Sequence, residues 1–114
     1  MTLVDTSVWA NHFRVGSSPL ISLLQEGLIL THPYVIGELA CGMLKNRSEI
    51  LTLLQTLPEV RIPEHYEVLL LLESQKHYRK GLGWVDVSLL AAAKFTGCSL
   101  WTVDGPLQKA ATRL

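Results

Sequence analysis

The chain has 114 residues, of which 48% are hydrophobic and 18% charged, and its ten basic and ten acidic residues give a formal net charge of zero. This length predicts a single domain covering residues 1–114, and the neutral balance lacks the basic surplus of proteins that bind nucleic acid without sequence preference. The longest aliphatic run, Val68 to Leu72, is too short to cross a bilayer, and two cysteines without a CxxC pair disfavour a disulfide framework or a zinc site.

The first predicted element is a buried strand that ends in a carboxylate. Residues 2–4 are apolar or β-branched, and Asp5 follows at once. Thr6 and Ser7 are then placed to cap a short helix over residues 7–13. Ligands of open α/β sheets bind beyond the carboxyl ends of the strands, so Asp5 is expected at the functional edge.

Short strands and helices alternate along the rest of the chain. The predicted strands cover residues 28–31, 60–62 and 99–103, and Asp104 ends the last one. The predicted helices cover residues 19–26, 34–44, 48–57, 64–80, 85–96 and 106–113, and the one over 64–80 is the longest. Apolar strands alternating with more numerous helices predict an α/β fold with a parallel sheet covered on both faces.

Four acids stand out because of where they lie. The only three aspartates, Asp5, Asp86 and Asp104, each sit at an element boundary. If the first and last strands are parallel neighbours, Asp5 and Asp104 emerge side by side. Glu38 lies among apolar neighbours on its helix, where burying a lone carboxylate is costly. Taken singly, each aspartate also fits a turn or a helix cap, and Glu38 fits a partly exposed helix position.

Taken together, the four acids favour a metal site. Clustered carboxylates repel one another unless a cation neutralises them, and no Lys or Arg stands next to any of the four in the sequence. Oxygen ligands without Cys or His favour Mg²⁺ or Mn²⁺. Such an ion activates water and stabilises charge on a phosphoryl oxygen, which fits phosphodiester hydrolysis.

Several segments follow one another in an order that is typical of one family. They are Val4–Trp9, Ile36–Leu39, Gly81–Asp86 with Ser88–Ala93, and Leu100–Asp104. Together they cover nearly the whole length, and on them the chain resembles PIN-domain proteins, more narrowly the VapC toxins of bacterial type II toxin–antitoxin pairs.

The resemblance implies a PIN fold, with a short central parallel sheet of about four strands flanked by helices on both faces. It implies an endoribonuclease toxin that uses Mg²⁺ or Mn²⁺ to hydrolyse phosphodiester bonds in RNA. Its catalytic and metal-binding quartet would be Asp5, Glu38, Asp86 and Asp104. Thr6 and Thr102 fall where the family often places a hydroxyl near the metal or its water, although a β-branched residue at a strand end is equally ordinary.

The resemblance also implies partners. They are a cognate VapB-like antitoxin that covers the acidic site and a second copy of the chain in a homodimer. A mean hydropathy of +0.27 without a membrane span is consistent with a covered surface. No basic segment followed by an apolar run marks the N-terminus for secretion, so we expect a cytoplasmic protein with no membrane partner.

One feature departs from the family, and one alternative function stays open. VapC proteins usually add a short last strand after the final helix, and no such strand follows it here. A truncated chain and a short tail would both explain this. The absence of the strand would affect dimer packing more than it would affect the acidic site. The alternative function is a non-catalytic PIN-like module that binds RNA or protein, which would predict a degraded quartet.

A weaker prediction concerns RNA contacts. Lys76, Arg79 and Lys80 cluster just before the glycine turn that leads to Asp86, where RNA phosphates could track along them. Basic residues at the end of a helix are equally well explained by the helix dipole. Trp84, in the turn next to Asp86, is the tryptophan best placed to stack on a base.

Overall fold

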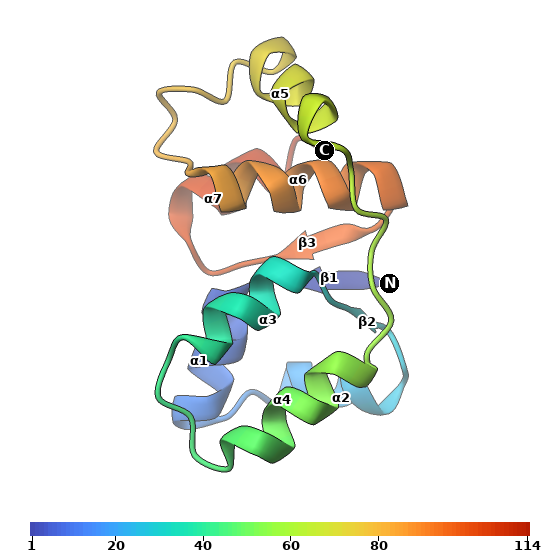
Figure 1. Ribbon diagram of the computed structural model, residues 1–114, viewed down its shortest axis with the longest axis vertical. Coiled ribbons are helices and arrows are strands. Elements are labelled where there is room, and N and C mark those ends of the chain that lie inside the picture. Colours follow the sequence, from blue (N-terminus) through green and yellow to red (C-terminus); the bar gives the residue numbers. More distant parts are fainter.

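The structure is a computed structural model that describes all residues 1–114, and it contains three strands and seven helices. In chain order the elements are β1 (Thr2–Val4), α1 (Thr6–Val15), α2 (Ser18–Gln25), β2 (Ile29–Leu30), α3 (Pro33–Ala40), α4 (Arg47–Thr56), α5 (His65–Ser74), α6 (Trp84–Thr96), β3 (Ser99–Trp101) and α7 (Gly105–Ala111). Helices α5, α6 and α7 lie on one side of the sheet and α1 to α4 on the other (Figure 1). None of the helices combines the length and the apolar character needed to cross a membrane.

The sheet is parallel and has the strand order β2-β1-β3. Thr2 pairs with Ile29 on one side and Ser99 on the other, and Val4 pairs with Trp101. The prediction that the first and last strands are parallel neighbours is therefore confirmed. All three carboxyl ends point to the same edge of the sheet, where α1 and α7 begin (Figure 1).

The expected strand over residues 60–62 does not form. Its remnant is a single parallel bridge between Thr31 and Glu59, closed by hydrogen bonds from the Thr31 amide to the Pro58 carbonyl (2.9 Å) and from the Val60 amide to the Thr31 carbonyl (3.0 Å). Prolines at positions 58 and 63 bracket the segment, and proline donates no backbone hydrogen bond to a ladder. The sheet accordingly has three strands where about four were expected.

Two expectations about helices are also wrong. The helix predicted over 64–80 ends at Ser74, because Lys76, just after the cap residue, adopts a left-handed backbone angle with φ of 52°. Arg79 has a second positive φ of 66°, so the helix does not resume before residue 80. The longest helix is α6, with 13 residues. Thr6 does not cap α1 but begins it, and Asp5 occupies the cap position, where its side chain makes no capping bond to the helix backbone.

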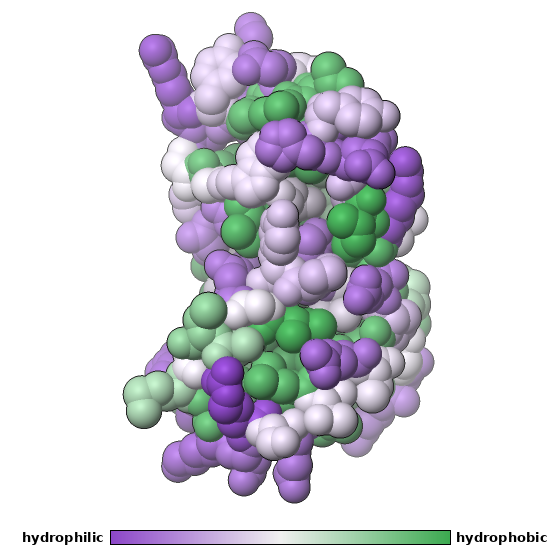
Figure 2. All heavy atoms as spheres, in the orientation of Figure 1, coloured by the Kyte–Doolittle hydropathy of each residue, from purple (hydrophilic) through white to green (hydrophobic).

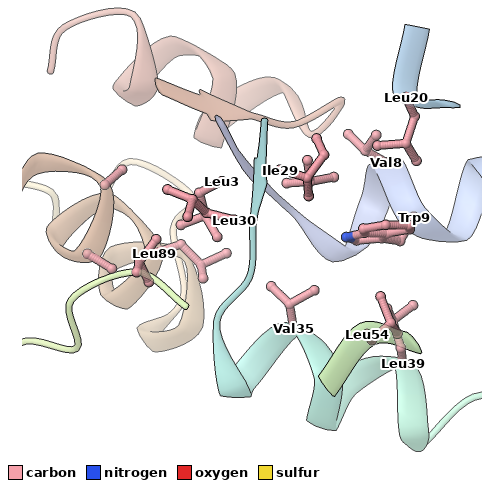
Figure 3. Close-up of a cluster of buried hydrophobic side chains, with 14 residues drawn as sticks. Leu3, Val8, Trp9, Leu20, Ile29, Leu30, Val35, Leu39, Leu54 and Leu89 are labelled. Atoms are coloured by element: carbon pink, nitrogen blue, oxygen red, sulfur yellow. The ribbon is translucent and has the colours of Figure 1, made fainter. Parts of the chain in front are cut away.

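The hydrophobic core fixes the sheet from both sides. The larger cluster includes Leu3 of β1, Ile29 of β2 and Trp9 of α1, all nearly inaccessible to solvent (Figure 3). A smaller cluster, with Leu90 and Leu107, joins α6 to α7. Burying one such side chain contributes about 1.5–3 kcal/mol. The core therefore holds β1 rigidly, and with it the residue at its carboxyl end.

Candidate active site

Asp5 is the buried acid at the end of β1. Its side chain is 6% exposed, and its amide donates a hydrogen bond to the carbonyl of Trp101 (2.9 Å), which ties it to β3. Its Oδ2 accepts hydrogen bonds from the hydroxyls of Thr102 and Ser7, each at 2.7 Å. Both bonds go to one oxygen, so Oδ1 remains available to another ligand.

Ser7 has a role that its place in the sequence does not reveal. Besides donating to Asp5, its Oγ accepts a hydrogen bond from the Val103 amide (3.2 Å) and lies 3.2 Å from the Thr102 hydroxyl. It thereby joins the start of α1 to the connection between β3 and α7. The only sequence signal was a hydroxyl two residues after a strand-end acid, which predicted a helix cap instead.

Glu38 lies on α3 and is joined to α1 through Thr6. The Thr6 hydroxyl donates a hydrogen bond to Glu38 Oε1 at 2.6 Å. Despite its apolar neighbours in sequence, Glu38 is exposed. Together with Thr6 it borders a pocket of about 660 Å³ between α1 and the segment that links α3 to α4.

Asp86 and Asp104 begin helices, and both accept local hydrogen bonds. Asp104 is the N-cap of α7 and accepts from the Leu107 amide (3.1 Å), while its own amide donates to the Thr102 hydroxyl (3.0 Å). Asp86, in the first turn of α6, accepts from the Gly83 amide (2.9 Å). The capping roles that the sequence left open are thus real. A carboxylate has lone pairs for further ligands beyond such a bond.

The pKa of Asp86 responds to the charges of the other two aspartates. Desolvation raises the pKa of Asp86, the Gly83 amide opposes this, and the charges of Asp104 and Asp5 raise the pKa further. The one ion pair in the structure joins Arg61 to Glu67. No Lys or Arg therefore neutralises these carboxylates.

The donor set fits a hard divalent cation, although no ready-made cage exists. No group of three or more His, Cys, Asp or Glu side chains converges closely enough to hold a metal ion. Mg²⁺, however, usually keeps several waters and binds through one or two carboxylates. The free Oδ1 of Asp5 and the uncompensated charge of Asp86 and Asp104 meet that requirement with oxygen alone.

The residues predicted to contact RNA differ in their exposure and in their contacts within the chain. Lys80 donates from Nζ to the Gln75 carbonyl (2.9 Å), and Lys76 and Arg79 are exposed. Trp84 opens α6, is 36% exposed, and has its ring 4.8 Å from that of His65. Their contact with RNA stays a prediction.

Two comparisons with known proteins point to the same family. The PIN domain family model matches residues 2–112. Ribonuclease VapC32 of Mycobacterium tuberculosis, in strain CDC 1551 / Oshkosh and in strain ATCC 25618 / H37Rv, is 41% identical over 111 residues, which cover 96% of this chain and 90% of the relative. The similarity therefore spans all the elements that carry the four acids.

Proposed function

The chain is a VapC-type member of the PIN-domain family, and on that premise we propose that it is a metal-dependent endoribonuclease, the toxin of a VapBC-type toxin–antitoxin pair. The observation that carries the proposal is the uncompensated charge where the strands end. The charges of Asp104 and Asp5 raise the pKa of Asp86, and no basic side chain pairs with any of the three. A site of this kind holds a divalent cation and the phosphodiester that the cation attracts.

The residues of the proposed site have two roles: some would bind the metal ion, and others orient those ligands. Asp5, Glu38, Asp86 and Asp104 would hold Mg²⁺ or Mn²⁺, which when bound supplies an activated water and stabilises charge on the phosphoryl oxygens. Thr102 and Ser7 fix the orientation of Asp5 by bonding to one of its oxygens. Thr6 does the same for Glu38. Ligands held in this way tune the affinity of a metal site.

Two protein partners belong to the proposal. Tyr66, Leu69 and Leu70 leave the outer face of α5 apolar and exposed, which suits a homodimer. Figure 2 shows hydrophobic surface over α5 at the top of the molecule. A separate apolar groove of about 300 Å³ lies between α1 and α4. It includes Trp9 and Leu54 and suits a segment of the antitoxin. Since RNA and an antitoxin would be met in the cytoplasm, a cytoplasmic location belongs to the same proposal.

The test is cleavage of total bacterial RNA by the purified protein with Mg²⁺, with Mn²⁺ and with EDTA. Discrete cuts are expected with either metal, and they should disappear with EDTA and in Asp5→Asn. Glu26→Gln is the matched control, because it removes an exposed acid just before β2, at the opposite end of the strands. Addition of the cognate antitoxin should abolish the cuts. Cleavage that survives both EDTA and Asp5→Asn would contradict the proposed site.

A second candidate is a non-catalytic PIN-like module that binds RNA or protein. The observation in its favour is that Asp86 and Asp104 already cap helices and that no three acids converge. A folded wild-type protein that cleaves nothing with either metal would favour this candidate over the nuclease.

A further inference from the structure

A basic pocket lies apart from the four acids, between the end of α5, α6 and α7. Its volume is about 480 Å³. Four cationic side chains border it, and no Asp or Glu side chain does; the four are Lys80, Lys94, Lys109 and Arg113. The chain has only ten basic residues and no net charge, so four of them in one pocket represent a strong separation of charge.

No Asp or Glu side chain pairs with the cations of the basic pocket. The one ion pair of the structure is formed elsewhere, by Arg61 and Glu67. Lys80 bonds to a backbone carbonyl, and no hydrogen bond joins Lys94, Lys109 or Arg113 to a carboxylate. Like charges held on neighbouring elements repel one another, and an anion between them removes that repulsion.

His77 supplies a second, independent observation. It borders the basic pocket, is 6% exposed, and its buried Nδ1 has no hydrogen-bond partner. Burial lowers the pKa of His77, and the charges of Lys80 and Lys94 lower it further. The positive potential of the pocket therefore extends to a buried group.

The basic pocket is continuous with the acidic edge along two helices. Asp104 caps α7, and Pro106, in the first turn of that helix, borders the pocket. Asp86 and Lys94 both lie on α6, eight positions apart, which corresponds to about 12 Å along the helix axis. A strand of RNA with one phosphate among the acids would reach the pocket within a few nucleotides.

We propose that the basic pocket binds a backbone phosphate of the RNA substrate, a few nucleotides away from the bond that is cut. The inference rests on the proposed nuclease function. A neutral protein with an acidic active site repels a polyanion there, so affinity for RNA has to come from cations placed at a distance. This assigns phosphate binding to Lys94, Lys109 and Arg113 in addition to Lys76 and Arg79, and Lys80 is common to both sets.

The first test measures binding of a fluorescein-labelled, mixed-sequence single-stranded RNA by fluorescence anisotropy, in the Asp5→Asn background with Mg²⁺ and a series of KCl concentrations. Lys94→Gln with Lys109→Gln should weaken binding several-fold at low salt. The slope of log K against log[salt] is negative, and its magnitude should decrease by about 0.7 for each RNA phosphate that the variant no longer neutralises. Arg61→Gln removes one positive charge away from the pocket and should leave the slope unchanged. Both lysines are exposed on helices, where glutamine is nearly as favourable, so the fold should survive.

The second test follows the imidazole NMR signals, with His12 and His32 as internal references. RNA should shift the His77 signals at the concentrations that saturate the anisotropy, whereas inorganic phosphate should need far higher concentrations. A pocket that takes inorganic phosphate as tightly as RNA would be a small-anion site and would overturn the proposal. So would unchanged RNA affinity and salt slope in the double variant. Discrete metal-dependent cuts by the wild type would then still support the nuclease, while pocket-dependent binding without cleavage would support the pocket alone.

Discussion

At the scale of single residues, Thr102 connects the acids of the site. Its hydroxyl donates to Asp5 Oδ2 and accepts from the Asp104 amide. Thr102→Val keeps the shape and removes both bonds, so we expect a loss of about 10–100-fold in kcat or metal affinity. Thr102→Ser should restore most of it. RNA cleavage measured as a function of Mg²⁺ concentration checks this, and a valine variant with wild-type metal dependence would show that Thr102 only fills space.

His32 makes the stability of the fold depend on pH. It is buried at the start of α3, its Nδ1 accepts from the Tyr34 amide (2.9 Å), and burial lowers its pKa from 6.5 to about 4. The folded state therefore resists a proton that the unfolded chain accepts below pH 6.5. Its contribution to stability is complete above that pH and is lost as the pH falls toward 4, by roughly 2 kcal/mol between pH 7 and 4.5.

Urea unfolding at the two pH values measures this effect. His32→Asn keeps a capping side chain but cannot titrate, so its free energy of unfolding should fall less on acidification than that of the wild type. His77, whose pKa is also lowered, contributes in the same direction in both proteins and cancels in the comparison. Identical pH dependence of the two proteins would argue against the assignment to His32.

Some residues of the site could be found from sequence and others could not. Asp5 and Asp104 were predicted to be neighbours because each follows an apolar strand, and strand ends share an edge. Ser7 was not found, since its partner Val103 is 96 residues away and only the pairing of β1 with β3 brings them together. Lys94 and Lys109 belong to different helices, and nothing in their local sequence marks them as neighbours.

At the scale of elements, Asp104 serves both a helix and the proposed metal site, and the two roles can be separated. Asp104→Ala should lower the free energy of unfolding by about 1 kcal/mol through loss of the α7 cap, and it should abolish cleavage. Asp104→Ser keeps a capping oxygen and should preserve stability, yet it should remain inactive. Thermal unfolding and RNA cleavage on the same samples test the pair, and an active serine variant would exclude a catalytic role.

The elements themselves were predictable where local chemistry decides them. The apolar strands β1 and β3 and the Ala- and Leu-rich α6 form close to the predicted positions. Residues 60–62 have a strand-like composition, but flanking prolines leave only one bridge. The end of α5 coincides with the positive φ of Lys76, a residue that carries no glycine or proline signal.

At the scale of the whole molecule, the outer face of α5 carries the proposed dimer contact. Leu70 is 64% exposed on that face. Leu70→Glu should place a charge in the contact and convert the dimer to a monomer, with half the mass in light scattering after size exclusion. Gln55→Glu adds the same charge on α4 and should leave the dimer intact. Equal masses for both variants would place the contact elsewhere.

The bond between Thr102 and Asp5 joins side chains 97 positions apart. The ribosome makes Asp5 well before Thr102 and Asp104, which lie near the other end of these 114 residues. Until β3 has left the exit tunnel, β1 lacks one of its two neighbours and the acids have not been assembled. A nascent chain in which β3 has not yet paired with β1 therefore lacks the Thr102 bond that orients Asp5.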